Sequence, residues 1–445
     1  MITTRTHHPK SERMKVLNRF GILATFMALM FLISPGVAGA QNYRNCAWPV
    51  EISPEGIGNW LGPESLARYW LMPIEKQDET MTFKGTYPHA RYFSFVAYNT
   101  NADGGPTEVA GDIYDAAIAP DPGSKNPFVY PGGSDGTYTV VISRTGEASG
   151  NTIKIDSDFG WVLLRVYVPT ADPSLGGESF TGSVPLPTIF LTRDGVTEEL
   201  QQCPSVNKLE DIREVYLKFF PPGQDLIGDE GTPSSDRLWF GAPRVTPPVL
   251  LPNPHNKYIA MFPGNEYQPG RIIVIHGKAP GFPDTYDGTP IWEPARTFRN
   301  VDVRFWSVCS TDLALPLGTV GCKSDMTTKL EGGYYTIVIS DDPLRPDWLR
   351  PNIEWLPWGD KGYMKLVFFR NMLPRPDFPF AIQKALEARC NFEFNLPVLP
   401  SREEVDSAGQ CAQDVMGEYY PVAVWCDKAT FLAGGWQACV KEKRH

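Results

Sequence analysis

The sequence has little of what metal and catalytic sites are commonly built from. It contains six histidines among 445 residues, and no two of its eight cysteines stand in a C-x-x-C arrangement. Zinc sites usually take Cys and His ligands at such short spacings, so the pattern argues against zinc. The EF-hand spacing D-x-[DN]-x-[DN]-G is absent as well. We therefore expect no cofactor and no bound metal ion.

Basic charge and long apolar runs are also scarce. Lys and Arg number 41 against 51 Asp and Glu, which gives a formal net charge of −10, and no basic tract follows residue 40. Such a chain is a poor partner for nucleic acid or anionic lipid. No segment after residue 40 is long and apolar enough to be a transmembrane helix. The 42 Pro and 40 Gly disfavour long helices and favour strands joined by turns.

The start of the chain has the pattern of a secretory leader. Basic residues precede the apolar run 20–33, and Ser34-Pro35-Gly36 then breaks that run. Ala38-Gly39-Ala40 supplies the small residues that a signal peptidase needs. The sequence predicts cleavage after Ala40 and an exported product, periplasmic or extracellular. An uncleaved anchor is the alternative, for which the apolar run is short.

All eight cysteines follow the leader, and an even number in an exported chain predicts four disulfides. Cys309 and Cys322 flank a loop with Pro and Gly, so we expect them to pair with each other. Cys46 and Cys203 would then tie the start of the first domain to its end. Two further bridges are expected within the tail, among Cys390, Cys411, Cys426 and Cys439.

An internal repeat organises the sequence between the leader and the tail. Each half contains Gly-x-x-Pro, then Arg-aromatic-aromatic-Ser, then a glycine-led β-branched run that ends in Ser, and finally Arg-x-x-x-Pro. These phrases begin at Gly85, Arg91, Gly136 and Arg165 in the first half, and at Gly277, Arg304, Gly333 and Arg370 in the second. We expect the two halves to superpose with Arg91 on Arg304 and Arg165 on Arg370.

Short β-branched and aromatic runs without helical patterns between them predict antiparallel sheets. The expected fold is all-β: two tandem antiparallel β-sandwich domains of jelly-roll type, with a small disulfide-rich C-terminal tail. The expected boundaries are 1–40 for the signal peptide, 41–235 and 236–385 for the two sandwiches, and 386–445 for the tail.

Several phrases in both domains resemble an uncharacterised family of exported bacterial proteins with tandem jelly-roll domains of unknown function. The resemblance covers both domains but not the tail. It implies the fold and the exported setting, and it brings no known reaction, so no catalytic residue follows from it. Besides the Arg-aromatic-aromatic-Ser strand, the phrases are Tyr114-Asp115, Asp121 to Ser124, Asn126 to Phe128, Trp355 to Pro357 and Arg370 to Pro374.

Two patterns could support catalysis. Gly132-Gly133-Ser134-Asp135-Gly136 matches the G-x-S-x-G nucleophile elbow, but a strand pattern follows it where an elbow has a helix, so a glycine-rich turn is the favoured interpretation. Clustered carboxylates could hold calcium or form an acid and base pair, although solvated turn residues explain them as well. These carboxylates are Asp112, Asp115, Asp121, Asp156 and Asp158.

The repeated arginines stand in strands among apolar residues, where a charge is costly unless it is paired. They could bind a ligand carboxylate or phosphate. Because they occur in both domains, however, we favour internal ion pairs in which a carboxylate is held bidentately.

The second domain is rich in aromatic residues, as are surfaces that bind sugars or apolar ligands. Core packing accounts for most of these residues, but the Pro/Gly turn at 355–359 favours exposure of at least one tryptophan. The sequence thus favours an exported non-catalytic binding or structural protein with an unknown small-molecule or glycan ligand. Its candidate binding residues are Arg304, Trp306, Trp355 and Trp358. The alternative is a secreted hydrolase or lyase that uses a carboxylate pair or Ser134.

Overall fold

The computed structural model describes residues 46–441, with gaps at 56–57, 101–107, 131–135, 171–179, 204–235, 247–250, 265–266, 284–300, 314–316 and 396–397. The predicted leader and its cleavage site lie outside these residues. Residues 43–445 belong to one compact unit. Within the described part of the chain, no helix is long and apolar enough to cross a membrane.

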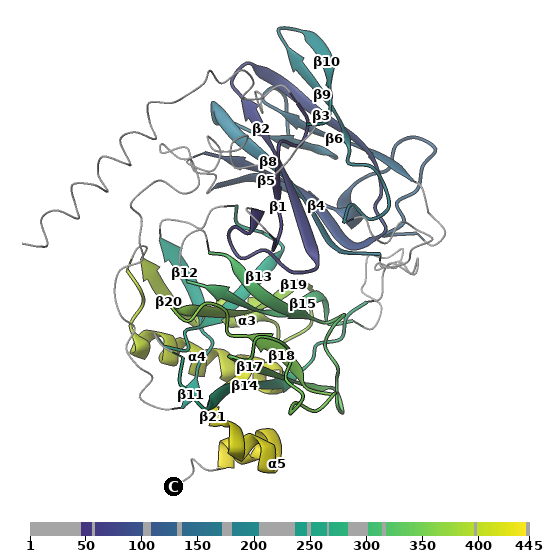
Figure 1. Ribbon diagram of the computed structural model, residues 1–445. Coiled ribbons are helices and arrows are strands. Elements are labelled where there is room, and N and C mark those ends of the chain that lie inside the picture. The colour runs from purple at the N-terminus through teal and green to yellow at the C-terminus, as the bar shows by residue number, and fades with distance from the viewer. Residues whose placement is uncertain are drawn as a thin grey trace, which may run out of the picture. The chain divides into compact units, whose positions relative to one another are not determined.

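The first half of the chain forms a sandwich of two five-stranded sheets (Figure 1). One sheet has the order β1-β2-β8-β4-β5, and its strands are Val50–Ile52, Ala67–Glu75, Phe159–Pro169, Ala90–Asn99 and Glu108–Tyr114. The other has the order β10-β9-β3-β6-β7, with strands Val196–Leu200, Thr188–Arg193, Asp78–Thr86, Thr137–Ser143 and Thr152–Lys154. A short 3₁₀ helix, η2 (Asp115–Ala117), follows β5 directly.

The second half forms another sandwich. Its four-stranded sheet has the order β13-β19-β15-β16, with strands Asn256–Met261, Lys365–Pro374, Val303–Asp312 and Thr319–Ser324. Its five-stranded sheet has the order β11-β21-β14-β17-β18, with strands Arg237–Leu238, Val422–Asp427, Arg271–Lys278, Tyr334–Ser340 and Glu354–Pro357. A parallel pair, β12 (Ala242–Thr246) with β20 (Asn391–Asn395), accompanies them. The helices are α3 (Ile382–Glu387), α4 (Arg402–Met416) and α5 (Lys428–Lys441), and a 3₁₀ turn, η4 (Gly417–Tyr419), follows α4.

The two sandwiches share one strand order and register, as the repeat predicts. β4 pairs with β8 as β15 pairs with β19, and the motif serines Ser94 and Ser307 lie opposite Arg165 and Arg370. In each sandwich the last strand of the second sheet, β7 or β18, is the one that runs parallel to its neighbour. The repeated sequence phrases therefore stand at equivalent places in two copies of one fold.

The tail is stapled by two disulfides, as expected, and it also completes the second sandwich. Cys390 is bonded to Cys411, and Cys426 to Cys439. The tail strand β21 lies between β14 and β11, in the place that β9 takes in the first sandwich. The predicted boundary at residue 385 therefore does not separate the tail from the second sandwich, because strand β21 of the tail belongs to the five-stranded sheet. The other predicted bridges, Cys46–Cys203 and Cys309–Cys322, are also present.

The glycine of the Gly-x-x-Pro phrase has a clear role in packing. Gly85 of β3 pairs with Tyr138 of β6, and Gly277 of β14 pairs with Tyr335 of β17. A Cβ atom would lie 2.6 Å from the Tyr138 hydroxyl at Gly85, and 2.7 Å from the Tyr335 hydroxyl at Gly277. Both tyrosines are buried in the core of their sandwich. The repeat thus preserves a glycine over which a core tyrosine lies.

Gly277→Ala should destabilise the protein by about 1–3 kcal/mol, the usual cost of overpacking a well-packed core. The Tyr335 ring cannot move aside easily, since it is fully buried and stacked on Trp306 at a centroid distance of 5.1 Å. Urea unfolding followed by circular dichroism measures the effect. Gly270→Ala is not a suitable control, because Gly270 has a φ of 77° and an alanine with that backbone conformation would itself be strained. Gly321→Ala is suitable, since a Cβ atom there would come no closer than 3.4 Å to its neighbours.

Candidate functional site

The central strands of the sandwiches are buried on both faces. One face of β4, β8, β15 and β19 points into the core of its own sandwich, while the other contributes to a cluster that contains residues of both halves, among them Tyr92, Tyr167, Phe305 and Met372. A charged residue in such a strand is removed from water whichever way it points. Its partner must therefore come from the protein.

Two Arg–Asp ion pairs connect the sandwiches reciprocally. Arg304 of β15 contacts Asp115 at the end of β5, with Nη1 3.0 Å from Oδ2 and Nη2 3.1 Å from Oδ1. Arg91 of β4 contacts Asp325, which follows β16. All four side chains are completely shielded from solvent. The prediction of internal ion pairs is confirmed for both arginines, and the Arg304 pair is bidentate as expected.

Each aspartate also binds the backbone of its own sandwich, two residues beyond the motif arginine. Asp115 Oδ2 accepts from the Phe93 amide at 3.0 Å, and Asp325 Oδ2 accepts from the Trp306 amide at 3.2 Å. Burial raises the pKa of Asp325 to about 6 and raises that of Asp115, although the facing arginines lower both values. The desolvation cost offsets much of the attraction within each pair, so these pairs are weak evidence of net stability.

The closing arginines have different partners. Arg370 lies 3.6 Å from the Glu64 carboxylate and 3.3 Å from the Tyr167 hydroxyl. Arg165 donates to the Tyr98 hydroxyl at 2.6 Å and to a backbone carbonyl at 2.9 Å. The expected carboxylate partner is therefore present for Arg370, whereas Arg165 is held by neutral oxygens.

A chain of groups familiar from catalytic sites lies nearby. The Asp112 carboxylate is 2.7 Å from His255 Nε2, and His255 Nδ1 is 2.7 Å from the Tyr92 hydroxyl, which donates to Ser94 at 2.7 Å. Burial raises the pKa of Tyr92 well above its ordinary value. Tyr92 and Ser94 are fully buried and His255 is 8 % exposed, so a substrate has no access to the end of this chain. We therefore interpret these four side chains as a buried hydrogen-bond network.

Of the four predicted binding residues, only Trp355 is reachable from solvent. Arg304 is paired with Asp115, while Trp306 and Trp358 belong to the second core and expose 0 % and 1 % of their surface. Trp306 lies on β15, a strand that is buried on both faces, so its side chain is buried whichever way it points, and it packs in the core of the second sandwich. The predicted turn at 355–359 is largely strand β18, and Trp358, which directly follows this strand, packs on Trp425 at a centroid distance of 5.7 Å. These three residues do not form an open surface.

An aromatic surface does exist on the second sandwich, built mostly from other residues. The outward side of β14, β17 and β21 packs against α5 and the loop before β18, around Ile272, Val274, Val338 and Val424. We name the half-buried rings beside this cluster the outer aromatic face: His276, Tyr334, Trp348, Trp355 and Trp436. Its centre is a three-ring stack. His276 lies 5.4 Å from Tyr334 and 4.9 Å from Trp436, with interplanar angles of 4° and 21°.

The stack is bordered by charged groups. Glu418 accepts from Lys278 at 2.5 Å and from the Tyr334 hydroxyl at 2.6 Å. Both hydrogen bonds lower the pKa of Glu418, so this border carboxylate is charged at pH 7. Burial lowers the pKa of His276, so the stacked imidazole is neutral at pH 7. A break at Gly435, with φ 64°, interrupts α5 immediately before Trp436. The face thus combines ring surface with donors and acceptors.

The sequence contained a partial signal for this face. After Arg271 at the start of β14, His276 and Lys278 are the polar residues of this strand, and at two-residue spacing they share one side of the sheet. Sequence reasoning missed the stack because Tyr334 and Trp436 come from segments whose pairing with β14 is long-range. Trp355 was predicted, and its indole nitrogen donates to the Ser340 hydroxyl at 2.9 Å.

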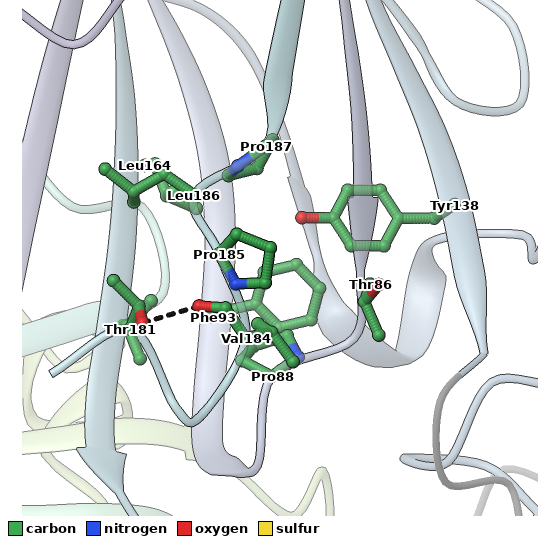
Figure 2. A pocket seen from close by; sticks show the side chains of 11 residues that line it. Thr86, Pro88, Phe93, Tyr138, Leu164, Thr181, Val184, Pro185, Leu186 and Pro187 are labelled. Carbon is green, nitrogen blue, oxygen red and sulfur yellow. Dashed lines mark hydrogen bonds between the residues drawn. The ribbon is translucent and has the colours of Figure 1, made fainter. Parts of the chain in front are cut away.

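A small hollow in the first sandwich offers little chemistry (Figure 2). It is barely large enough for one water molecule, and its lining is largely proline, valine, leucine and aromatic carbon. Tyr138 is the single titratable side chain in that lining, and burial raises its pKa beyond its ordinary range. Figure 2 shows the Thr181 hydroxyl donating to the Val184 carbonyl, at 2.6 Å. The hollow lacks the acid and base pair that a hydrolase or lyase would need.

The remaining candidates for catalysis or metal binding do not converge. Ser134 lies outside the described residues. Asp112 and Asp115 have the separate partners given above, and Asp156 and Asp158 pair with Lys154 and Lys76 on the surface. In the described part of the chain, Glu64, Cys309 and Cys322 have ligand atoms within 4.8 Å of one another. The sulfur atoms of Cys309 and Cys322 form a disulfide bond, so neither is a thiolate that could bind a metal ion.

Comparison with known proteins gives distant structural neighbours only. No family model matches the chain, and neither does any curated protein. An uncharacterised protein from Burkholderia cenocepacia has a similar structure with a TM-score of 0.43 and 13 % identity, over 82 % of this chain and 88 % of that one. The VPA0106 protein from Vibrio parahaemolyticus has a TM-score of 0.32 and 12 % identity, over 68 % and 83 %.

Proposed function

We propose that this is an exported, non-catalytic binding protein, and that the outer aromatic face of the second sandwich takes up a glycan. The leader pattern and the four disulfides support export, because disulfides persist in oxidising compartments. The buried acids and bases described above are occupied with one another. Among the described residues, the outer aromatic face is an accessible group of rings with polar neighbours.

The observation that carries the proposal is the stack of His276 between Tyr334 and Trp436, with Lys278 and Glu418 at its border. Sugars present C–H faces that pack on aromatic rings and hydroxyls that bond to charged or amide groups. A purely apolar ligand would leave the Lys278 and Glu418 charges without compensation for their lost water. The mixed character of the face therefore favours a glycan over an apolar ligand.

Trp436→Ala should weaken glycan binding about tenfold, which corresponds to a loss of about 1.4 kcal/mol. Trp355→Ala should also weaken it, since Trp355 remains a predicted binding residue. Titration of soluble polysaccharides and oligosaccharides with calorimetric detection measures the affinities. Trp239→Ala is the matched control, because Trp239 is equally half-buried but packs on Tyr420 at the side of α4. Binding that Trp239→Ala weakens and Trp436→Ala leaves unchanged would contradict the proposed site.

A further inference from the structure

The Cys309–Cys322 disulfide differs from the others in what surrounds its sulfur atoms. It joins directly opposite residues of β15 and the edge strand β16. Cys309 is fully buried, whereas Cys322 is half-buried. Cys309 Sγ lies 3.2 Å from a carboxylate oxygen of Glu64 and 3.4 Å from a guanidinium nitrogen of Arg370. At Cys426–Cys439, by contrast, the sulfur atoms lie 3.5 Å from the backbone carbonyls of Asp427 and Gly435.

Glu64 is an unusual neighbour for a structural disulfide. It is completely buried, and it comes from the first sandwich, whereas both cysteines belong to the second. Its Oε2 accepts from the Ser307 hydroxyl at 2.6 Å, and its Oε1 has no hydrogen-bond partner among the described residues. A disulfide sulfur has no proton to donate. The contact between Cys309 Sγ and Glu64 Oε2 can therefore become a hydrogen bond only when Cys309 is a thiol.

We propose that Cys309–Cys322 is a thiol–disulfide exchange site, attacked at Cys322 by an external dithiol, and that Glu64 and Arg370 stabilise the reduced form. The thiolate of the dithiol attacks Cys322 Sγ, the S–S bond breaks, and the electron pair leaves on Cys309 Sγ beside the Arg370 guanidinium. Cys309 then takes up a proton from solvent, and the resulting thiol donates a hydrogen bond to the Glu64 carboxylate.

The second thiolate of the dithiol completes the exchange. It attacks the dithiol sulfur of the mixed disulfide and releases Cys322, which also takes a proton from solvent. The dithiol loses two electrons and two protons and becomes a disulfide, while Cys309 and Cys322 gain the same number. Arg370 favours departure of the Cys309 thiolate, since a nearby cation lowers the pKa of a thiol. The half-buried Cys322 provides the accessible sulfur.

The first test uses the folded protein without its leader. It is equilibrated with dithiothreitol at increasing concentration, alkylated, and mapped by mass spectrometry. We expect Cys309 and Cys322 to become labelled at the lowest concentration, before the other six cysteines. Labelling of another pair first, or of all four pairs together on global unfolding, would overturn the proposal. With Cys309→Ala, glutathione disulfide should form a mixed disulfide on Cys322 in the folded protein. With Cys322→Ala, Cys309 should remain largely unmodified.

The second test addresses Glu64. Glu64→Gln should shift the equilibrium about fivefold toward the disulfide, because a neutral acceptor replaces a charged one. This corresponds to about 20 mV for a two-electron couple. Glu393→Gln is the control, since that carboxylate pairs with Arg244 at the surface and should leave the equilibrium unchanged. Circular dichroism confirms that each variant is folded. An unchanged equilibrium in folded Glu64→Gln would show that the carboxylate has no part in the exchange.

Discussion

Asp115→Asn is expected to cost about 3–5 kcal/mol of unfolding free energy, the usual penalty for removing one partner of a buried ion pair. The substitution leaves the Arg304 guanidinium without a counter-charge in a place that solvent does not reach. The Asn side chain does not titrate, so the variant lacks the gain in stability that the raised pKa of Asp115 gives the parent protein as pH falls. The loss should therefore be at least as large at about pH 5 as at about pH 7.5. Urea unfolding at both pH values provides the measurement.

The reverse substitution should behave differently with pH. Arg304→Met leaves Asp115, whose pKa burial raises even when Arg304 is present, so its pKa in this variant should be higher still. A folded-state pKa above the unfolded value means that the folded protein binds the proton more tightly, and stability then increases as pH falls through that pKa. The loss caused by Arg304→Met should therefore be smaller at about pH 5 than at about pH 7.5.

Two comparisons separate the missing charge from the missing contacts. The double variant Asp115→Leu with Arg304→Met removes both charges and should recover most of the lost stability, because apolar replacement of a buried pair is often neutral or better. The exposed pair of Arg244 and Glu393 should contribute less than about 1 kcal/mol by the same assay. Equal losses for the buried and exposed pairs would refute the argument.

Removing the Cys46–Cys203 disulfide by replacing both residues with Ala should cost about 4–5 kcal/mol in the chain-entropy model. The bridge has a sequence separation of 157 and ties the segment before β1 to the segment after β10. Removal of Cys426–Cys439, whose separation is 13, should cost less because it closes a much shorter loop. Thermal unfolding of both variants under non-reducing conditions decides between them. A larger loss for the shorter loop would mean that local packing outweighs chain entropy.

Features with a local or repeated signature were predictable from the sequence. The Arg-aromatic-aromatic-Ser phrase identified β4 and β15, and the spacing of the cysteines was sufficient for Cys46–Cys203 and Cys309–Cys322. The burial of Trp306 could have been predicted only if both faces of β15 had been known to be buried. That knowledge depends on how the sandwiches pack, which the pattern of one strand does not determine.

Long-range pairing accounts for the rest. Strand β21 follows α4 in the tail but pairs with β14, so no short window of sequence indicates that it completes the second sheet. The carboxylate partners were missed for the same reason, since Asp325 is far from Arg91 in the chain. The His276 stack requires three separate segments. Of the four predicted binding residues, only Trp355, which lies in strand β18, is found on the outer aromatic face.

The reciprocal contacts of Arg91 with Asp325 and of Arg304 with Asp115 are those of an isologous interface, in which residue i of one copy meets residue j of the other and the reverse also holds. A two-fold homodimer of one ancestral sandwich would place the same two charges in the same way. Duplication and fusion of such a gene would yield this chain, in which the linker holds the former subunits at high effective concentration. Either half on its own would then contain one arginine and one aspartate that lack the oppositely charged partners provided by the other half.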